Sequence, residues 1–182
     1  GCPRSPIRED RLCTQGWELI PSQPSREHGE ERNTLLGGPL SAAMAVMSVD
    51  LGIVSCAKEA LAMGKELAAA AKRYSDNPLI ASLFDPEAIR KGIHPDKLEV
   101  TPDDVRAGRV LDKALLEVDQ AMKLATAKTD EAGARQFAMV IAECSQAVAE
   151  AAGKRLIGSG EKVSEGEKAA LARIRSHLGL TP

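Results

Sequence analysis

The chain has 182 residues, of which 43% are hydrophobic, 27% charged and 2% aromatic, and its formal net charge is −2. So few aromatic side chains imply an aliphatic core, which favours packed helices over a β-sandwich, and the balanced charge provides no basic excess to attract nucleic acid. No apolar run is long enough to span a membrane and the N-terminus lacks a signal-peptide pattern, so we expect a cytoplasmic protein.

Residues 1–38 differ in composition from the rest of the chain. They contain no alanine and no lysine, and they show no sustained helix-like or strand-like period. We predict a disordered tail over residues 1–38 and a single α-helical domain over residues 39–182. Two interpretations of the tail stay open. It is either a native disordered arm or sequence foreign to the protein, derived from a vector or translated from upstream of a true start at Met44 or Met47. On either interpretation, a chain that begins at Met44 should be nearly as stable as the full chain.

The first strong helical pattern covers residues 40–74. Its apolar residues recur at intervals of three and four, which places them on one face of a helix. Asp50 and Gly52 are the candidates to interrupt this pattern.

Three dipeptides that end in proline mark further helix starts. Asn77–Pro78, Asp85–Pro86 and Thr101–Pro102 each combine a side chain that can cap a helix with a proline at the first helical position. After the third of these, Asp103 and Asp104 lie in the first turn, where the helix dipole favours negative charge.

Two further long patterns follow. Apolar residues spaced three and four apart run from Val105 to Ala125, and this continuous seam predicts one helix packed against another. The next pattern covers residues 130–152. Cys144 lies on its apolar face, where a buried structural cysteine is expected rather than a nucleophile.

The last helix is predicted together with both of its ends. Ser164 and Glu167 have the spacing of a capping box, and Gly179 supplies the left-handed position that follows a helix. The buried stripe of this helix is expected to comprise Val163, Ala170, Leu171, Ile174 and Leu178.

These patterns predict an all-α fold. We expect a helical bundle of four main helices, with one or two short connecting helices between residues 78 and 100, and no strand. The long apolar seams favour antiparallel neighbours that pack at shallow angles.

Two sequence features resemble functional motifs but have simpler explanations. Residues 94–97, "HPDK", contain the loop tripeptide of J-domains, yet Pro86 and Gly92 leave no room for the long basic helix that precedes it there, so a turn is expected. Residues 153–162 are glycine-rich and basic, as in a phosphate-binding loop, but they lack the spacing of a P-loop, so a connection between helices is expected.

The chain also lacks the Glu-x-x-His pairs that hold di-iron sites in helical bundles. We therefore assign no catalytic, cofactor-binding or metal-binding residue.

The C-terminal helix pair resembles the closing helices of TerB-like proteins, the bacterial tellurite-resistance-associated α-helical family. The matching residues are Val148, Ala149, Gly153, Val163, Ser164, Glu167, Leu171, Ile174, Leu178 and Gly179. The resemblance implies a stress-response protein that binds a divalent metal ion. Members typically carry an acidic residue directly before the glycine, in a turn associated with metal binding. Ala152 occupies that position here, so the resemblance supplies no metal ligand.

We expect a non-enzymatic cytoplasmic α-helical protein that acts through protein–protein interaction or self-association, without a cofactor or a specific metal. The motivation is the length of the apolar seams. The alternative is the TerB-like protein that binds a divalent cation, for which the available carboxylates are Glu150, Glu161, Glu165 and Glu167. An enzyme whose catalytic residues meet only in the fold is a third alternative.

Overall fold

The computed structural model describes residues 24–51, 57–87, 98–153 and 163–181, and these residues form helices and no strand. The all-α prediction is confirmed. The helices are α1 (Pro24–Leu51), α2 (Ala57–Arg73), α3 (Pro78–Leu83), α5 (Pro102–Arg106), α6 (Val110–Lys128), α7 (Glu131–Gly153) and α8 (Glu165–His177). The described residues thus contain five long helices where four were expected, because the pattern predicted over residues 40–74 is divided between α1 and α2.

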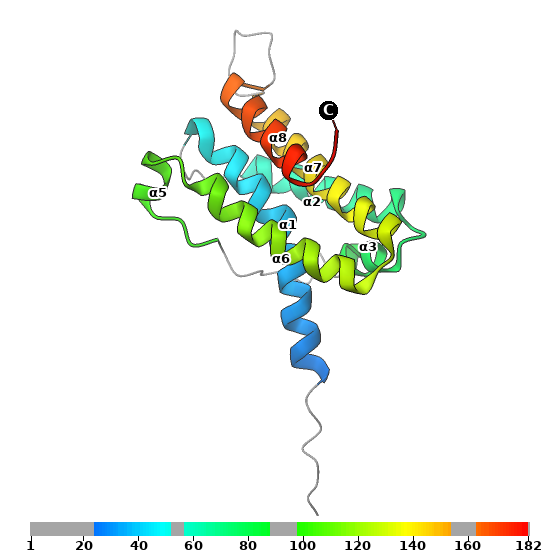
Figure 1. The fold of residues 1–182 in the computed structure, drawn as a ribbon. Helices are drawn as coiled ribbons and strands as arrows, with labels where there is room; N and C mark the ends of the chain where they lie inside the picture. Colours follow the sequence, from blue (N-terminus) through cyan, green and yellow to red (C-terminus); the bar gives the residue numbers. More distant parts are fainter. Residues whose placement is uncertain (1–23, 52–56, 88–97, 154–162, 182) are drawn as a thin grey trace, which may run out of the picture.

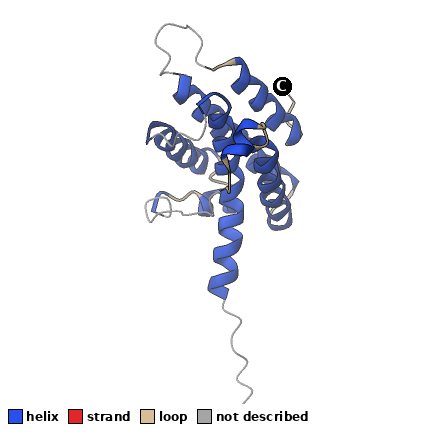
Figure 2. Ribbon diagram, turned by 90° about the vertical axis from the view of Figure 1, so that its left-hand side faces the viewer, coloured by secondary structure: helices blue, strands red, loops and turns tan. Residues whose placement is uncertain are grey.

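Helix α1 runs through the middle of the bundle (Figure 1). It packs most extensively on α6 and α7, and also on α8. Its middle section is buried on every side, so apolar and small residues surround it rather than forming one stripe. The N-terminal part of α1 extends out of the bundle in both ribbon views (Figures 1 and 2).

The predicted boundary between tail and domain is wrong. Helix α1 begins at Pro24, and Leu35 and Leu36 belong to the main hydrophobic core. A chain that begins at Met44 would lack these two core leucines, so its expected near-normal stability no longer follows. The prediction of a disordered tail over residues 1–23 lies outside the described residues.

The sequence Gly37-Gly38-Pro39 sits inside α1 rather than before it. A Cβ added at Gly38 would lie 2.7 Å from the Cβ of Ala121 on α6, so the absent side chain allows the two helices to approach closely. Pro39 is fully buried and has no backbone N–H, which leaves the carbonyl of Leu35 without its usual helical donor. The glycine therefore serves helix packing, and the proline is accommodated within the helix.

Helix α2 packs mainly on α7, and the short α3 follows it. The predicted cap at Asn77 is confirmed, because its Oδ1 accepts from the backbone N–H groups of Leu79 at 3.1 Å and Ile80 at 3.3 Å. The Nδ2 of the same buried side chain donates to the carbonyl of Gly133 and the Oε1 of Gln136, both on α7. One asparagine thus starts α3 and attaches it to α7.

The seam predicted from Val105 to Ala125 is not one helix. Helix α5 ends at Arg106, and Gly108 adopts a φ of +67° before α6 begins. This left-handed conformation is favourable only for glycine and a few polar residues, and it turns the chain between the two helices. The apolar spacing continued across the break, which is why the pattern concealed it.

Both predicted ends of α8 are confirmed. The Oγ of Ser164 accepts from the backbone N–H of Glu167 at 3.1 Å, and the N–H of Ser164 donates to the Glu167 carboxylate at 3.0 Å. Gly179 has a φ of +67°. Ala170, Leu171 and Ile174 are buried as expected.

The contact between Gly38 and Ala121 predicts opposite outcomes for two glycine substitutions in α1. Gly38→Ala should lower the free energy of unfolding by roughly 1–3 kcal/mol, because the new methyl group overpacks the α1–α6 contact. Gly29→Ala, where an added Cβ meets no atom within 4 Å, should raise it by roughly 0.5–1 kcal/mol through helix propensity. Chemical denaturation measures both, and Ala121→Gly should partly rescue Gly38→Ala. Equal effects of the two glycine substitutions would contradict the close approach.

The capping box of α8 predicts that Ser164→Ala lowers the free energy of unfolding by about 1 kcal/mol, since the first turn loses its hydrogen-bond acceptor. Ser176, exposed on the same helix, provides the control. Ser176→Ala should change the denaturation midpoint far less. A parent-like midpoint for Ser164→Ala would show that the cap does not stabilise α8.

Candidate functional site

Among the described side chains Cys144 is a free cysteine, and it is buried. Its side chain has no exposed surface, and the main core encloses it. Burial raises the pKa of the thiol well above its usual range, and the carboxylates of Glu66 and Glu143 raise it further. The thiolate that nucleophilic chemistry requires is therefore disfavoured. The predicted burial of Cys144 on the apolar face of its helix is confirmed.

Two carboxylates on facing helices share one arginine between α2 and α7. Arg73 forms ion pairs with Glu66 at 2.6 Å and with Glu143 at 3.2 Å, and the hydroxyl of Tyr74 donates to Glu143 at 3.3 Å. The Oε2 atom of Glu143 is shielded from solvent and makes no hydrogen bond of good geometry, even to the nearby guanidinium. This Glu66–Glu143 cluster joins the two helices through imperfectly paired charge.

The environment of this cluster also shifts two pKa values. Desolvation raises the pKa of Glu66, the charges of Glu143 and Glu150 raise it further, and Arg73 opposes the shift. Desolvation and Glu143 likewise raise the pKa of Tyr74. A raised carboxyl pKa is a feature of general acids, but here both carboxylates are engaged with Arg73, and neither of the two pockets described below is lined by these residues.

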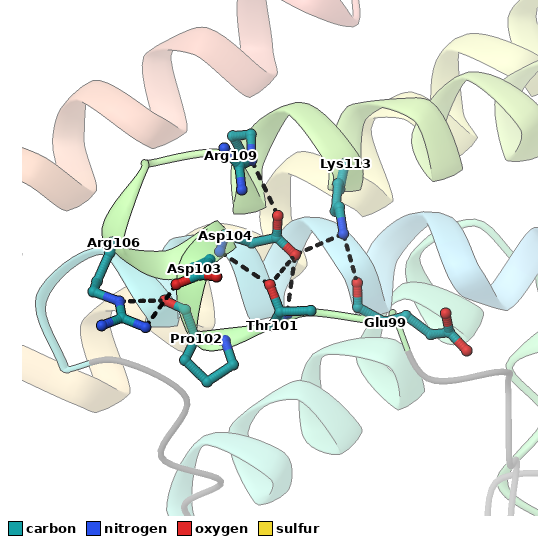
Figure 3. Close-up of polar contacts among 8 residues, drawn as sticks. All are labelled: Glu99, Thr101, Pro102, Asp103, Asp104, Arg106, Arg109 and Lys113. Carbon is teal, nitrogen blue, oxygen red and sulfur yellow. Dashed lines mark hydrogen bonds and ion pairs between the residues drawn. The ribbon is translucent and has the colours of Figure 1, made fainter.

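Asp104, at the start of α5, is a buried charge that accepts four hydrogen bonds (Figure 3). Its buried carboxylate accepts hydrogen bonds from the N–H and hydroxyl of Thr101, both at 2.9 Å. It also accepts from Lys113 at 2.6 Å and Arg109 at 3.1 Å, and Lys113 donates in addition to the carbonyl of Glu99 at 3.1 Å.

These donors hold the pKa of Asp104 far below its usual range, chiefly through the Lys113 hydrogen bond and then the two bonds from Thr101. The carboxylate is permanently ionised near neutral pH and its oxygens are committed to protein donors. The Asp104 cluster therefore joins α5 to the first turn of α6 and to the segment before α5. Its hydrogen bonds stabilise the contact between these segments.

The Asp104 cluster predicts a pH-dependent loss of stability in Asp104→Asn. The folded pKa lies below the unfolded value of about 3.9, so the ionised side chain stabilises the fold above that pH, and this contribution is lost as the pH falls. The melting temperatures of the parent protein and the variant should differ most at neutral pH and should approach each other as the pH falls below the unfolded pKa of about 3.9. Asp103→Asn, which removes only an exposed ion pair with Arg106, is the matched control. A difference that is constant with pH would contradict the ionised cluster.

One pocket lies where the turn between α2 and α3 meets the turn between α6 and α7. It has a volume of about 430 Å³, and its polar groups already serve the fold. Asn77 caps α3, Asp130 accepts from the N–H of Gly133 at 2.7 Å, and Lys128 forms an ion pair with Glu31 at 2.5 Å. Because these side chains are bonded within the protein, we assign no catalytic or ligand-binding role to this pocket.

A second, larger and more apolar pocket lies between α7 and α8, with a volume of about 710 Å³ and an open side; we call it the α7–α8 groove. Its lining comprises Gln146, Val163, Lys168, Leu171, Ala172, Arg175, Ser176, Gly179, Leu180 and Thr181. Leu171, Val163 and Leu180 provide apolar surface that is continuous with the core. The α8 members follow the i, i+3, i+4, i+7, i+8 spacing from Lys168 to Ser176, so they form one face along that helix.

The charges on the α7–α8 groove are positive. Its described lining includes Lys168 and Arg175 and no carboxylate. Lys168 forms an ion pair with Glu165 at 2.8 Å, whereas the described hydrogen bond of Arg175 goes to the carbonyl of Thr181 at 3.2 Å. An apolar surface edged by an exposed arginine is typical of a protein-binding site.

Among the residues that the structure describes, the carboxylates that the sequence suggested for function do not line the α7–α8 groove. The "HPDK" tetrapeptide, Glu161 and most of the glycine-rich loop lie outside the described residues. Of the other carboxylates considered for a metal, Glu150 accepts from Gln146, while Glu165 and Glu167 serve Lys168 and the α8 cap. Among the side chains that the structure describes, no three histidine, cysteine, aspartate or glutamate residues are grouped to hold a metal ion.

Reasoning from the sequence identified Leu171 only as a core residue and missed the groove. The spacing of Lys168, Ala172, Arg175 and Gly179 was a usable signal, because intervals of four, three and four define one helix face. That face lies beside the buried stripe of α8 rather than within it.

No family model, curated protein or solved structure matches this chain. The resemblance of the C-terminal helix pair to TerB-like proteins accordingly stays a prediction. None of the helices within the described ranges has an apolar stretch long enough to cross a membrane.

Proposed function

We propose that this chain is a non-enzymatic α-helical protein that acts through protein–protein interaction or self-association, and that the α7–α8 groove is the contact surface. The groove is the single observation that carries the proposal. It combines apolar side chains continuous with the core and an open side of a size suited to the side chains of a partner. A cytoplasmic location belongs to the same proposal, in keeping with the free thiol of Cys144.

The physical reason is the cost of apolar surface in water. Covering such surface stabilises a complex by roughly 25 cal/mol per Å² before the costs of association are subtracted. The strongest polar clusters elsewhere, around Asp104 and around Glu66 and Glu143, already stabilise contacts between helices. The groove differs because it is open: the exposed Ala172 and the half-buried Val163 lie over a floor formed by the largely buried Leu171 and Leu180, and its rim carries exposed polar groups.

Two exposed alanines on α8 allow a matched test. Ala172 lines the groove, whereas Ala169 is equally classed as exposed but is not among the lining residues. Peptides selected from a random display library against the immobilised full chain should bind the parent protein and Ala169→Phe alike. They should bind Ala172→Phe at least about tenfold more weakly, because the phenylalanine fills the groove. Thermal melts of both variants check that the fold is kept.

Selected peptides that bind Ala172→Phe as well as the parent protein would contradict the groove as the contact surface, and so would a library without any binder. Light scattering over a range of concentrations separates the two forms of the proposal. A mass that rises with concentration for the parent protein and for Ala169→Phe, but not for Ala172→Phe, would identify a second copy of the chain as the occupant.

A further inference from the structure

We propose that the occupant of the α7–α8 groove is an amphipathic helix of a partner protein that carries carboxylates seven residues apart. This inference rests on the proposed function and specifies the partner. Three observations support it: the secondary structure available for recognition, the spacing of two cations along α8, and the sign of the charge on the groove lining.

The lining composition favours a helix over other kinds of peptide. A peptide strand binds by pairing with an exposed sheet edge, and the part of the chain that the structure describes contains no strand. A polyproline segment binds between aromatic side chains, and the described lining of the groove contains none. A groove beside a long helix, with aliphatic side chains along it, suits the apolar face of another helix.

The spacing on α8 sets the register of that helix. Lys168 and Arg175 are seven residues apart, which is two turns and about 10.5 Å along the helix axis. Leu171 and Ala172 lie between them on the groove. A partner helix alongside α8 would therefore place carboxylates at positions i and i+7 next to the two cations, with apolar side chains at i+3 and i+4 facing Leu171 and Ala172.

Charge selects an acidic partner. The described lining carries two cations and no carboxylate, so a basic helix would be repelled and an acidic one attracted. Arg175 should contribute more than Lys168, because Lys168 already has Glu165 at 2.8 Å whereas the described bond of Arg175 goes to a backbone carbonyl. A guanidinium can donate two parallel hydrogen bonds to one carboxylate, which also fixes the orientation of the partner.

The test uses three versions of one synthetic helical peptide. Its apolar residues are copied from the library peptide that binds the parent protein most tightly and binds Ala172→Phe more weakly. The versions differ only at two positions seven residues apart, which carry glutamate, glutamine or lysine. Fluorescence anisotropy with the full chain at low salt should rank the affinities as glutamate above glutamine above lysine. The glutamate and lysine versions should differ by about tenfold, as two partly exposed charge pairs allow.

Substitution of the arginine supplies the specific control. Arg175→Gln should weaken binding of the glutamate version about threefold to fivefold and leave the glutamine version unchanged. Arg175→Lys should retain most of the charge preference, and Ala169→Phe should behave as the parent protein. Added salt should reduce the difference between the glutamate and glutamine versions, since the pairs lie at the rim.

The outcomes separate this inference from the proposed function. Equal binding of all three versions, still weakened by Ala172→Phe, would overturn the acidic partner and leave the groove as a contact surface. A glutamate version that binds Ala172→Phe and the parent protein equally would show charge attraction outside the groove, which also overturns the inference. A fourth peptide carries phosphoserine at the two charged positions. If it binds far more tightly than the glutamate version, the partner is a phosphopeptide and the inference of an acidic helix is overturned. A library without a binder sensitive to Ala172→Phe would remove the proposed function and the inference together.

Discussion

The bundle depends on the close passage of α1 beside α6, where Gly38 meets Ala121. Because Gly38 has no side chain and Ala121 has only a methyl group at this point, α1 can lie deep in the bundle with α6, α7 and α8 packed around it. The small and aliphatic residues of its middle section are then buried on all sides. Such a helix supplies core surface to each neighbour at once, so a displacement of α1 would alter every interface that it forms.

Polar side chains at helix starts fix the outer elements onto this central arrangement. Asn77 caps α3 while it donates to α7, and Asp104 completes the capping box of α5 with Thr101 while it accepts from Arg109 and Lys113 at the start of α6. In both cases one side chain accepts from the backbone at the start of a short helix and also reaches a neighbouring segment. Short helices such as α3 and α5 would be marginal alone, and these contacts explain why they persist. The α7–α8 groove differs from these contacts because its lining is mainly apolar.

The parts of the fold that could be predicted are those with a local cause. The caps at Asn77, Thr101 and Ser164 follow from neighbouring residues, and the structure contains all three. The start of α1 was missed because residues 28–34 are polar and exposed or half-buried, so they show no apolar stripe, and Gly38 resembles a helix breaker until its contact with α6 is known. The groove was missed because a cavity depends on how α7 and α8 are placed together, and the spacing on α8 alone does not give that placement.

The central position of α1 also has a consequence for how the chain folds. The helix is synthesised before α6, α7 and α8, yet these later helices cover its apolar residues. Its contacts therefore join segments that are far apart in sequence, and each requires closure of a long loop, which slows folding relative to a bundle built from sequential hairpins. During synthesis, Leu35 and Leu36 stay accessible to chaperones until the C-terminal half of the chain has emerged from the ribosome.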